Sequence, residues 1–97
     1  MPNKLQKFAE LNSFENTFAF HHDILEEGFP KKGKWHSEVF KNNNPIVVEL
    51  GCGRGEYTIG LSKNDTTKNY IGVDVKGNRI WTGAKFALEN KMNHVAF

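Results

Sequence analysis

A short glycine-rich segment and one aspartate are the residues whose types and spacing could support chemistry. Gly51, Gly53 and Gly55 alternate with other residues within Glu49–Gly55, and Asp74 follows further along the chain. Glycine tolerates positive φ and has no Cβ atom, so such a backbone can turn sharply and lie directly against a ligand. An aspartate that closes the next strand can accept hydrogen bonds from both ribose hydroxyls. Together these residues predict a nucleoside-binding site.

The spacing of the glycines indicates which nucleoside. A dinucleotide-binding loop reads G-x-G-x-x-G, whereas this loop reads G-x-G-x-G and continues with Glu56, whose carboxylate suits a pyrophosphate poorly. Glu49 precedes the glycines and can help to hold a cationic ligand, and S-adenosylmethionine (SAM) carries an ammonium and a sulfonium. The sequence therefore favours SAM, with purely structural turns as the alternative. The predicted cofactor-binding residues are Glu49, Gly51, Gly53, Gly55 and Asp74, and no metal site is predicted.

The segments around the loop must position it, and residues 46–50 give the clearest strand pattern. This continuous apolar run, closed by glycines, predicts a strand buried on both faces of a parallel sheet. Residues 56–63 predict a helix that buries Tyr57 and Leu61, which are spaced at i, i+4. The loop then lies between the carboxyl end of a strand and the start of a helix, where α/β folds bind ligands.

The same alternation continues to the end of the sequence. A second strand is predicted over residues 69–74, a second helix over 78–90 and a third strand over 93–97. The second helix is expected to bury one face, formed by Ile80, Ala84, Ala87 and Leu88. Alternating strands and helices predict an α/β fold with a Rossmann-like, doubly wound sheet, of which these residues form the amino-terminal half.

The first 44 residues have a different pattern. Leu5, Phe8 and Ala9 have the spacing of a short helix, later phenylalanines have no clear period, and Lys41–Pro45 contains turn-forming residues. We therefore expect two regions: an amino-terminal extension at residues 1–44 that packs onto the domain, and the first half of a SAM-binding domain at residues 45–97.

Composition sets broad limits on the protein class. With 38% apolar and 25% charged residues the chain resembles an ordinary globular protein, and its net charge of +2 does not by itself indicate a nucleic-acid partner. No apolar stretch reaches the length of a membrane span, and no signal core follows Met1, so a cytosolic protein is expected. The single cysteine, Cys52, excludes an internal disulfide.

Several segments resemble the amino-terminal portion of the bacterial tRNA (guanine-N7-)-methyltransferase family, and the likeness covers nearly the whole chain. The matching segments beyond the glycine loop are Lys4–Glu10, Gly33–Trp35, Ile71–Gly77 and Trp81–Lys85. The resemblance implies a class I methyltransferase that transfers the methyl group of SAM to tRNA. It implies that Glu49 and Asp74 contact SAM and that the Gly51–Gly55 backbone lines the cofactor. The family's proposed catalytic aspartate, in a Pro-Asp-Pro-Trp-type motif, would lie beyond Phe97, so no catalytic residue is predicted in this chain.

Three other functions stay open from the residues alone. The chain could belong to a methyltransferase of the same fold that acts on a small molecule or a protein. It could instead be a nucleotide- or dinucleotide-binding module, or a non-catalytic interaction domain. The glycine loop and Asp74 do not distinguish the methyl acceptors.

Four further groups of residues could be functional. The segment His21–Asp23 could suggest a metal site, but solvated loop residues are expected because no supporting His or Cys follows at ligand spacing. Cys52 has no partner base in the sequence and is expected to be a small loop residue. Trp81 and Lys85 share a helical face, and packing against the extension is favoured over contact with substrate. Lys31, Lys32, Lys34 and Trp35 fit a tRNA contact and a solvated loop with one buried tryptophan equally well.

Overall fold

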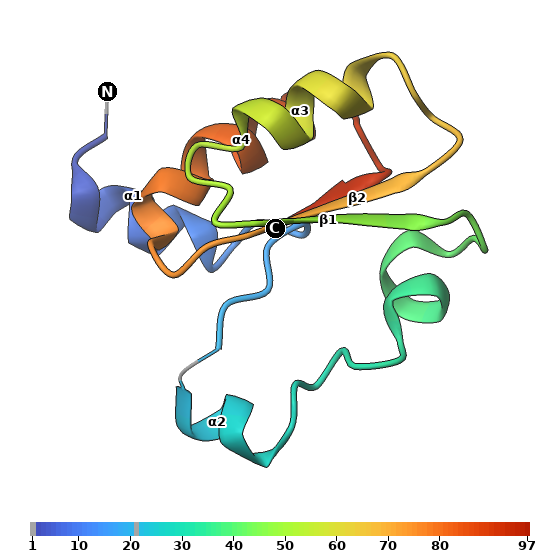
Figure 1. Cartoon of the computed structure of the whole chain (residues 1–97). Helices are drawn as coiled ribbons and strands as arrows, with labels where there is room; N and C mark the ends of the chain where they lie inside the picture. The colour runs from blue at the N-terminus through green and yellow to red at the C-terminus, as the bar shows by residue number, and fades with distance from the viewer. Residues whose placement is uncertain (1, 21) are drawn as a thin grey trace.

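The computed structural model describes residues 2–20 and 22–97 and contains one parallel sheet (Figure 1). Its strands are β1 (Ile46–Leu50), β2 (Asn69–Val73) and β3 (Val95–Ala96), in the order β1-β2-β3. The first two predicted strands are confirmed, with β2 ending one residue earlier than expected. The third is only two residues long and shorter than the predicted 93–97. The predicted α/β class with a parallel sheet is confirmed.

Three helices lie on one side of this sheet (Figure 1). α3 (Glu56–Lys63) connects β1 to β2, and α4 (Gly77–Glu89) connects β2 to β3. α1 (Lys4–Leu11) packs against α4 and begins at a capping box, in which the side chains and backbone N–H groups of Asn3 and Gln6 bond reciprocally. The predicted helices at 56–63 and 78–90 are confirmed within one residue.

Phe14 still packs on the α4 side of the sheet. The later part of the extension lies on the opposite side (Figure 1). It contains α2 (His22–Glu27) and a one-turn π-helix, η1 (Trp35–Phe40). Phe40 packs with Ile71 of β2 and Ala96 of β3 in a second buried cluster, and Trp35 lies against that cluster. These contacts agree with an extension that packs onto the domain, since α1 packs against α4 and Phe40 packs on β2 and β3.

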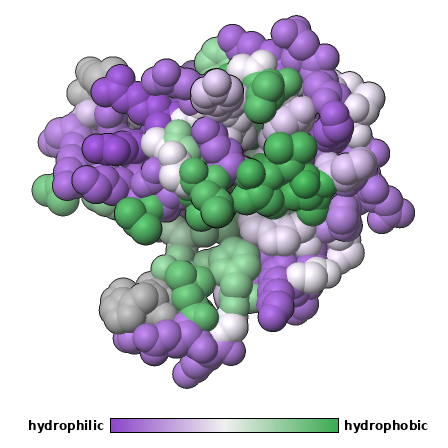
Figure 2. Space-filling view, viewed as in Figure 1, coloured by the Kyte–Doolittle hydropathy of each residue, from purple (hydrophilic) through white to green (hydrophobic). Residues whose placement is uncertain are grey.

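The prediction that the first strand is buried on both faces is wrong. Val48 and Leu50 of β1 are 51% and 80% exposed. Val47 packs against the buried cluster on the α4 side of the sheet, and Ile46 packs against the cluster around Phe40. The reason is topological, because β1 is an edge strand and the extension covers only the end of the strand at Ile46. An apolar band crosses the middle of the surface in Figure 2, where β1 crosses the molecule in Figure 1.

The predicted buried face of α3 is also wrong. Tyr57 and Leu61 are 73% and 53% exposed, whereas Thr58, Ile59 and Ser62 are buried. The buried face contains small residues because α3 contacts both β2 and β3 and approaches the sheet closely. In a helix of eight residues a single apolar pair does not determine which face is buried. The buried face of α3 is marked instead by the small polar residues Thr58 and Ser62.

The expected face of α4 is partly correct. Ala84 and Ala87 are buried as predicted, but Leu88 is exposed and the buried face centres on Trp81 instead. The indole Nε1 of Trp81 donates a 2.6 Å hydrogen bond to Oε2 of Glu10 in α1, and the Nζ atom of Lys85 lies 4.8 Å from the ring centroid. The favoured role in packing against the extension is therefore confirmed for Trp81, whereas Lys85 packs on Trp81 within α4.

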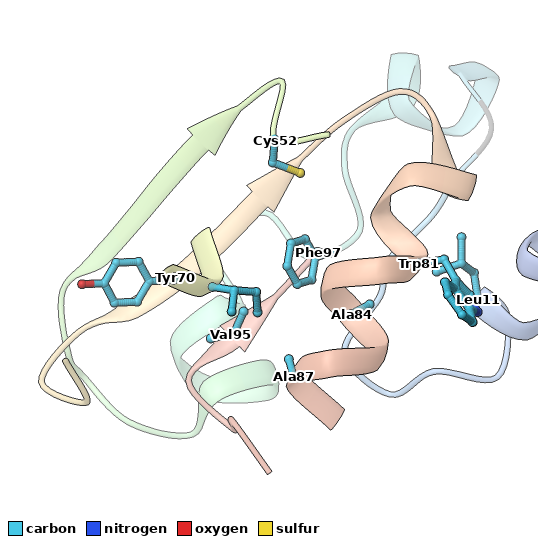
Figure 3. Packing of buried hydrophobic residues seen from close by; sticks show 9 residues of the cluster. Leu11, Cys52, Tyr70, Trp81, Ala84, Ala87, Val95 and Phe97 are labelled. Atoms are coloured by element: carbon cyan, nitrogen blue, oxygen red, sulfur yellow. The ribbon is translucent and has the colours of Figure 1, made fainter. Parts of the chain in front are cut away.

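Phe97, directly after β3, lies between the sheet and α4 (Figure 3). Its ring also lies against three glycines. A Cβ atom added to Gly55 or to Gly72 would lie 2.8 Å from the ring of Phe97. One added to Gly83 would lie 2.9 Å from the ring and 2.8 Å from the carbonyl oxygen of Arg54. The loop, β2 and α4 therefore approach one another only because these positions carry no side chain.

We expect Gly83→Ala in α4 to destabilise the protein by about 1–3 kcal/mol, because the new methyl group would overlap the backbone carbonyl of Arg54 as well as the Phe97 ring. Gly60→Ala in α3 is the matched control, since its Cβ meets no atom within 4 Å. That change should stabilise the helix by about 0.5–1 kcal/mol. Urea unfolding of the full-length protein measures both effects, and equal midpoints for the two variants would contradict this packing.

Candidate functional site

The glycine loop turns sharply at the carboxyl end of β1. Gly51, Gly53 and Gly55 have φ values of 70°, 56° and 79°, in the left-handed region that favours glycine. The N–H groups of Gly51 and Cys52 both donate to the carbonyl of Val73, at 2.7 and 2.9 Å. The loop is therefore held against the end of β2, and α3 begins immediately after Gly55 without a side-chain cap.

Asp74 lies against this loop. The backbone N–H of Gly53 donates to its Oδ2 atom and that of Lys76 to its Oδ1 atom, both at 2.8 Å. These bonds from Lys76 and Gly53 hold the pKa of Asp74 below its ordinary value, so the carboxylate stays ionised at neutral pH. Each carboxylate oxygen has a further lone pair, so Asp74 can accept additional hydrogen bonds from a ligand.

The three glycines differ in what surrounds them. A Cβ atom on Gly51 or Gly53 would meet nothing within 4 Å, whereas one on Gly55 would meet the ring of Phe97 at 2.8 Å. Gly51 and Gly53 thus have open space in the direction where a side chain would project. Gly55 is required by the internal packing. Open backbone thus lies beside an ionised carboxylate, which agrees with the predicted geometry of a nucleoside site.

Glu49, the acid before the glycines, lies on β1 opposite Gly72 of β2. Its Oε1 atom accepts a 2.6 Å hydrogen bond from the hydroxyl of Thr58, a residue of α3 that sequence reasoning missed. The signal was available, because Thr58 and Ser62 are small polar residues at i, i+4 on the helix that follows the loop. The spacing of Tyr57 and Leu61 instead predicted the wrong buried face of α3, since both side chains are exposed.

Cys52 is a free cysteine that is buried within the loop. Burial, together with the negative charges of Asp74 and Glu49, raises the pKa of its thiol to about 11. The thiol is therefore protonated at neutral pH, as expected for a small residue that fits the loop. The electrostatic influence of both acids on Cys52 also indicates that Glu49 and Asp74 lie near the same loop.

The segment His21–Asp23 is described only in part. His21 and the side chain of His22 lie outside the described residues, so the interpretation as a solvated loop is not tested for them. From His22 onward the chain is helical, in α2, so the expected loop is wrong there, although Asp23 is exposed. Within residues 2–20 and 22–97, no cluster of three His, Cys, Asp or Glu side chains could hold a metal ion.

The lysines near Trp35 are only partly free to contact another molecule. Lys31 pairs with Glu38, with 3.0 Å between Nζ and Oε1. Trp35 stacks on Phe29 with a centroid separation of 5.8 Å and belongs to the aromatic packing. Lys32 and Lys34 are exposed, and their contact with tRNA stays a prediction.

Two surface hollows in the part of the chain that the structure describes lie away from the loop. One, of about 530 Å³, is lined by residues of α1 and the segment before it, and the other, of about 350 Å³, includes Lys63 and His94. Neither is lined by a predicted cofactor-binding residue. None of the described helices combines the length and the apolar character needed to cross a bilayer.

Comparison with known proteins identifies the chain's relatives. It is 53% identical over 96 residues to the tRNA (guanine-N(7)-)-methyltransferase of Bacteroides fragilis, covering 98% of this chain and 38% of the relative. The protein of the same name from Christiangramia forsetii is 49% identical over 96 residues, covering 98% of this chain and 43% of the relative. The chain thus spans about two fifths of the length of these curated relatives. No solved structure matches.

The expected resemblance to the amino-terminal portion of tRNA (guanine-N7-)-methyltransferases is therefore confirmed. A family model described as "Putative methyltransferase" matches residues 43–95, which is more than half of the chain and includes the glycine loop and Asp74. The chain belongs to this methyltransferase family.

Proposed function

We propose that the protein methylates the N7 atom of a guanine in tRNA and that this chain binds the methyl donor, SAM. The observation that carries the proposal is the identity of about 50% across almost the whole chain to proteins named tRNA (guanine-N(7)-)-methyltransferase. Membership of a methyltransferase family implies SAM as the donor. A protein that acts on tRNA would work in the cytoplasm.

In this proposal each predicted site residue has a separate role. Asp74 accepts hydrogen bonds from the ribose hydroxyls of SAM, through the lone pairs that Gly53 and Lys76 leave available. The open backbone at Gly51 and Gly53 lies along the ribose and methionine portion. Glu49 supplies a negative charge for the cationic end of the cofactor. Gly55 contributes indirectly, by allowing the loop to pack on Phe97.

Little acid–base chemistry is needed for this reaction. SAM supplies an electrophilic methyl group on a sulfonium, and N7 of guanine has a free lone pair to receive it. Catalysis then depends mainly on aligning donor and acceptor. We assign no catalytic residue within this chain, which in our proposal holds the donor in a fixed orientation.

We further propose that the sheet is the first half of a Rossmann-like class I methyltransferase domain, beginning at residue 45 after the 1–44 extension. In a doubly wound sheet of order 3-2-1-4-5-6 the first strand is central. The order β1-β2-β3 leaves the outer side of β1 unpaired, with Val48 and Leu50 exposed beside it. Both features suit a strand and covering helices supplied by further chain.

The full-length protein should incorporate the labelled methyl group of SAM into unmodified tRNA. Nucleoside mass spectrometry of the digested tRNA should then find 7-methylguanosine. Methylation of a protein or small molecule without tRNA methylation would contradict the proposed acceptor while leaving the proposed donor intact.

Asp74→Asn should weaken SAM binding by about tenfold or more, because the variant loses charge-assisted hydrogen bonds worth about 1.5–3 kcal/mol each. Asp65→Asn is the matched control. Asp65 lies before β2 and Asp74 directly after it, and each carboxylate accepts a hydrogen bond from the backbone N–H two residues later in the chain, Thr67 for Asp65 and Lys76 for Asp74. Calorimetry with SAM and with NAD on the full-length protein separates the outcomes. Unchanged SAM affinity in Asp74→Asn, or binding of NAD without SAM, would argue against this site.

The 97-residue chain alone should be poorly stable and inactive. Its unpaired β1 edge and its exposed Val48, Leu50 and Val73 leave apolar surface in water. We expect a broad thermal transition, binding of an apolar dye, and no methyl transfer to tRNA. A sharp cooperative melt together with tRNA methylation by these residues alone would show that the expectation is wrong.

A further inference from the structure

Thr58 is a polar residue with an unusual environment. Its side chain is only 2% exposed, on the face of α3 that is turned towards the sheet. A threonine hydroxyl within a helix commonly bonds to a carbonyl one turn earlier. Here it donates to Oε1 of Glu49 on β1, with 2.6 Å between the oxygens. The bond therefore joins the helix after the glycine loop to the strand before it.

This hydrogen bond restricts the carboxylate of Glu49. A glutamate side chain has several rotatable bonds, and fixing them on ligand binding costs conformational entropy. Bonds from a hydroxyl to an ionised carboxylate are short and strong, as the 2.6 Å separation illustrates. No described residue donates a hydrogen bond to the other oxygen, Oε2. Thr58 thus occupies one oxygen and leaves the second available to a ligand.

We propose that Thr58 is a positioning residue for the cofactor, which holds the carboxylate of Glu49 in the orientation that receives the cationic end of SAM. This inference rests on the proposed function, because it assumes that the loop binds SAM. Thr58 itself would not touch the cofactor. Its contribution would pass entirely through Glu49, and a hydroxyl at residue 58 would be the required feature.

The alternative is that Thr58 only fills space beneath α3. A packing role depends on the size of the side chain, which valine preserves and serine does not. A positioning role depends on the hydroxyl, which serine preserves and valine does not. If Thr58 positions Glu49, Thr58→Val should weaken SAM binding and Thr58→Ser should not. If Thr58 only fills space, Thr58→Ser should be the more harmful change.

The test measures SAM affinity by calorimetry on the full-length protein, with ligand-free thermal melts to confirm folding. Thr58→Val should weaken SAM binding by about tenfold, the scale of one hydrogen bond to a charged group, and Thr58→Ser should stay within about twofold of the wild type. In a Glu49→Gln background, Thr58→Val should have no further effect, because the two residues act as one unit. Thr58→Ala removes the hydroxyl without placing a methyl group against Glu49 and serves if valine prevents folding.

Wild-type affinity in Thr58→Val or Thr58→Ala, or an equal loss of affinity with and without Glu49→Gln, would overturn the positioning role while leaving the proposed function intact. Failure of the wild-type protein to bind SAM would overturn both. Three results together would support the inference. Thr58→Val weakens SAM binding about tenfold, Thr58→Ser does not, and Thr58→Val has no further effect in the Glu49→Gln background.

Discussion

The close approach of three backbone segments around the ring of Phe97 is the constraint on which the rest of the structure depends. Gly55, Gly72 and Gly83 come from the loop, β2 and α4, and a Cβ atom on any of them would lie within 3 Å of that ring. Phe97 also exchanges backbone hydrogen bonds with the extension, from its N–H to Asn16 and from Phe18 to its carbonyl. The ring of Phe97 therefore limits how closely the loop, β2 and α4 approach one another, and its backbone joins the extension to the end of β3.

That packing fixes the position of the site. Because Gly55 rests on Phe97, the remaining loop glycines are held at the end of β2, where Gly51 and Cys52 bond to Val73 and Gly53 bonds to Asp74. The acid and the open backbone are thus oriented before any ligand arrives. A preorganised site of this kind does not spend binding energy on ordering its own loop.

Much of this arrangement could be predicted from the sequence. The continuous apolar run of β1, the helical spacing of apolar residues in α4 and the alternation of glycines before α3 were enough to place the loop and Asp74 at one end of a parallel sheet. The exposed faces of β1 and α3 could not be predicted, because they depend on which neighbours cover them. The bond from Thr58 to Glu49 was also missed, because the apolar pair Tyr57 and Leu61 predicted the wrong buried face of α3 and the partner of Thr58 lies on another element.

The most direct test of the account is to follow the backbone amide signals of the full-length protein by NMR while SAM is added. Binding at this site should give large shifts at Gly51, Gly53 and Lys76, which lie near Asp74, and small shifts at Lys63 and His94 beside the distant hollow. Saturable shifts confined to the distant hollow, with the glycine loop unchanged, would contradict the claim that this loop and Asp74 bind the cofactor.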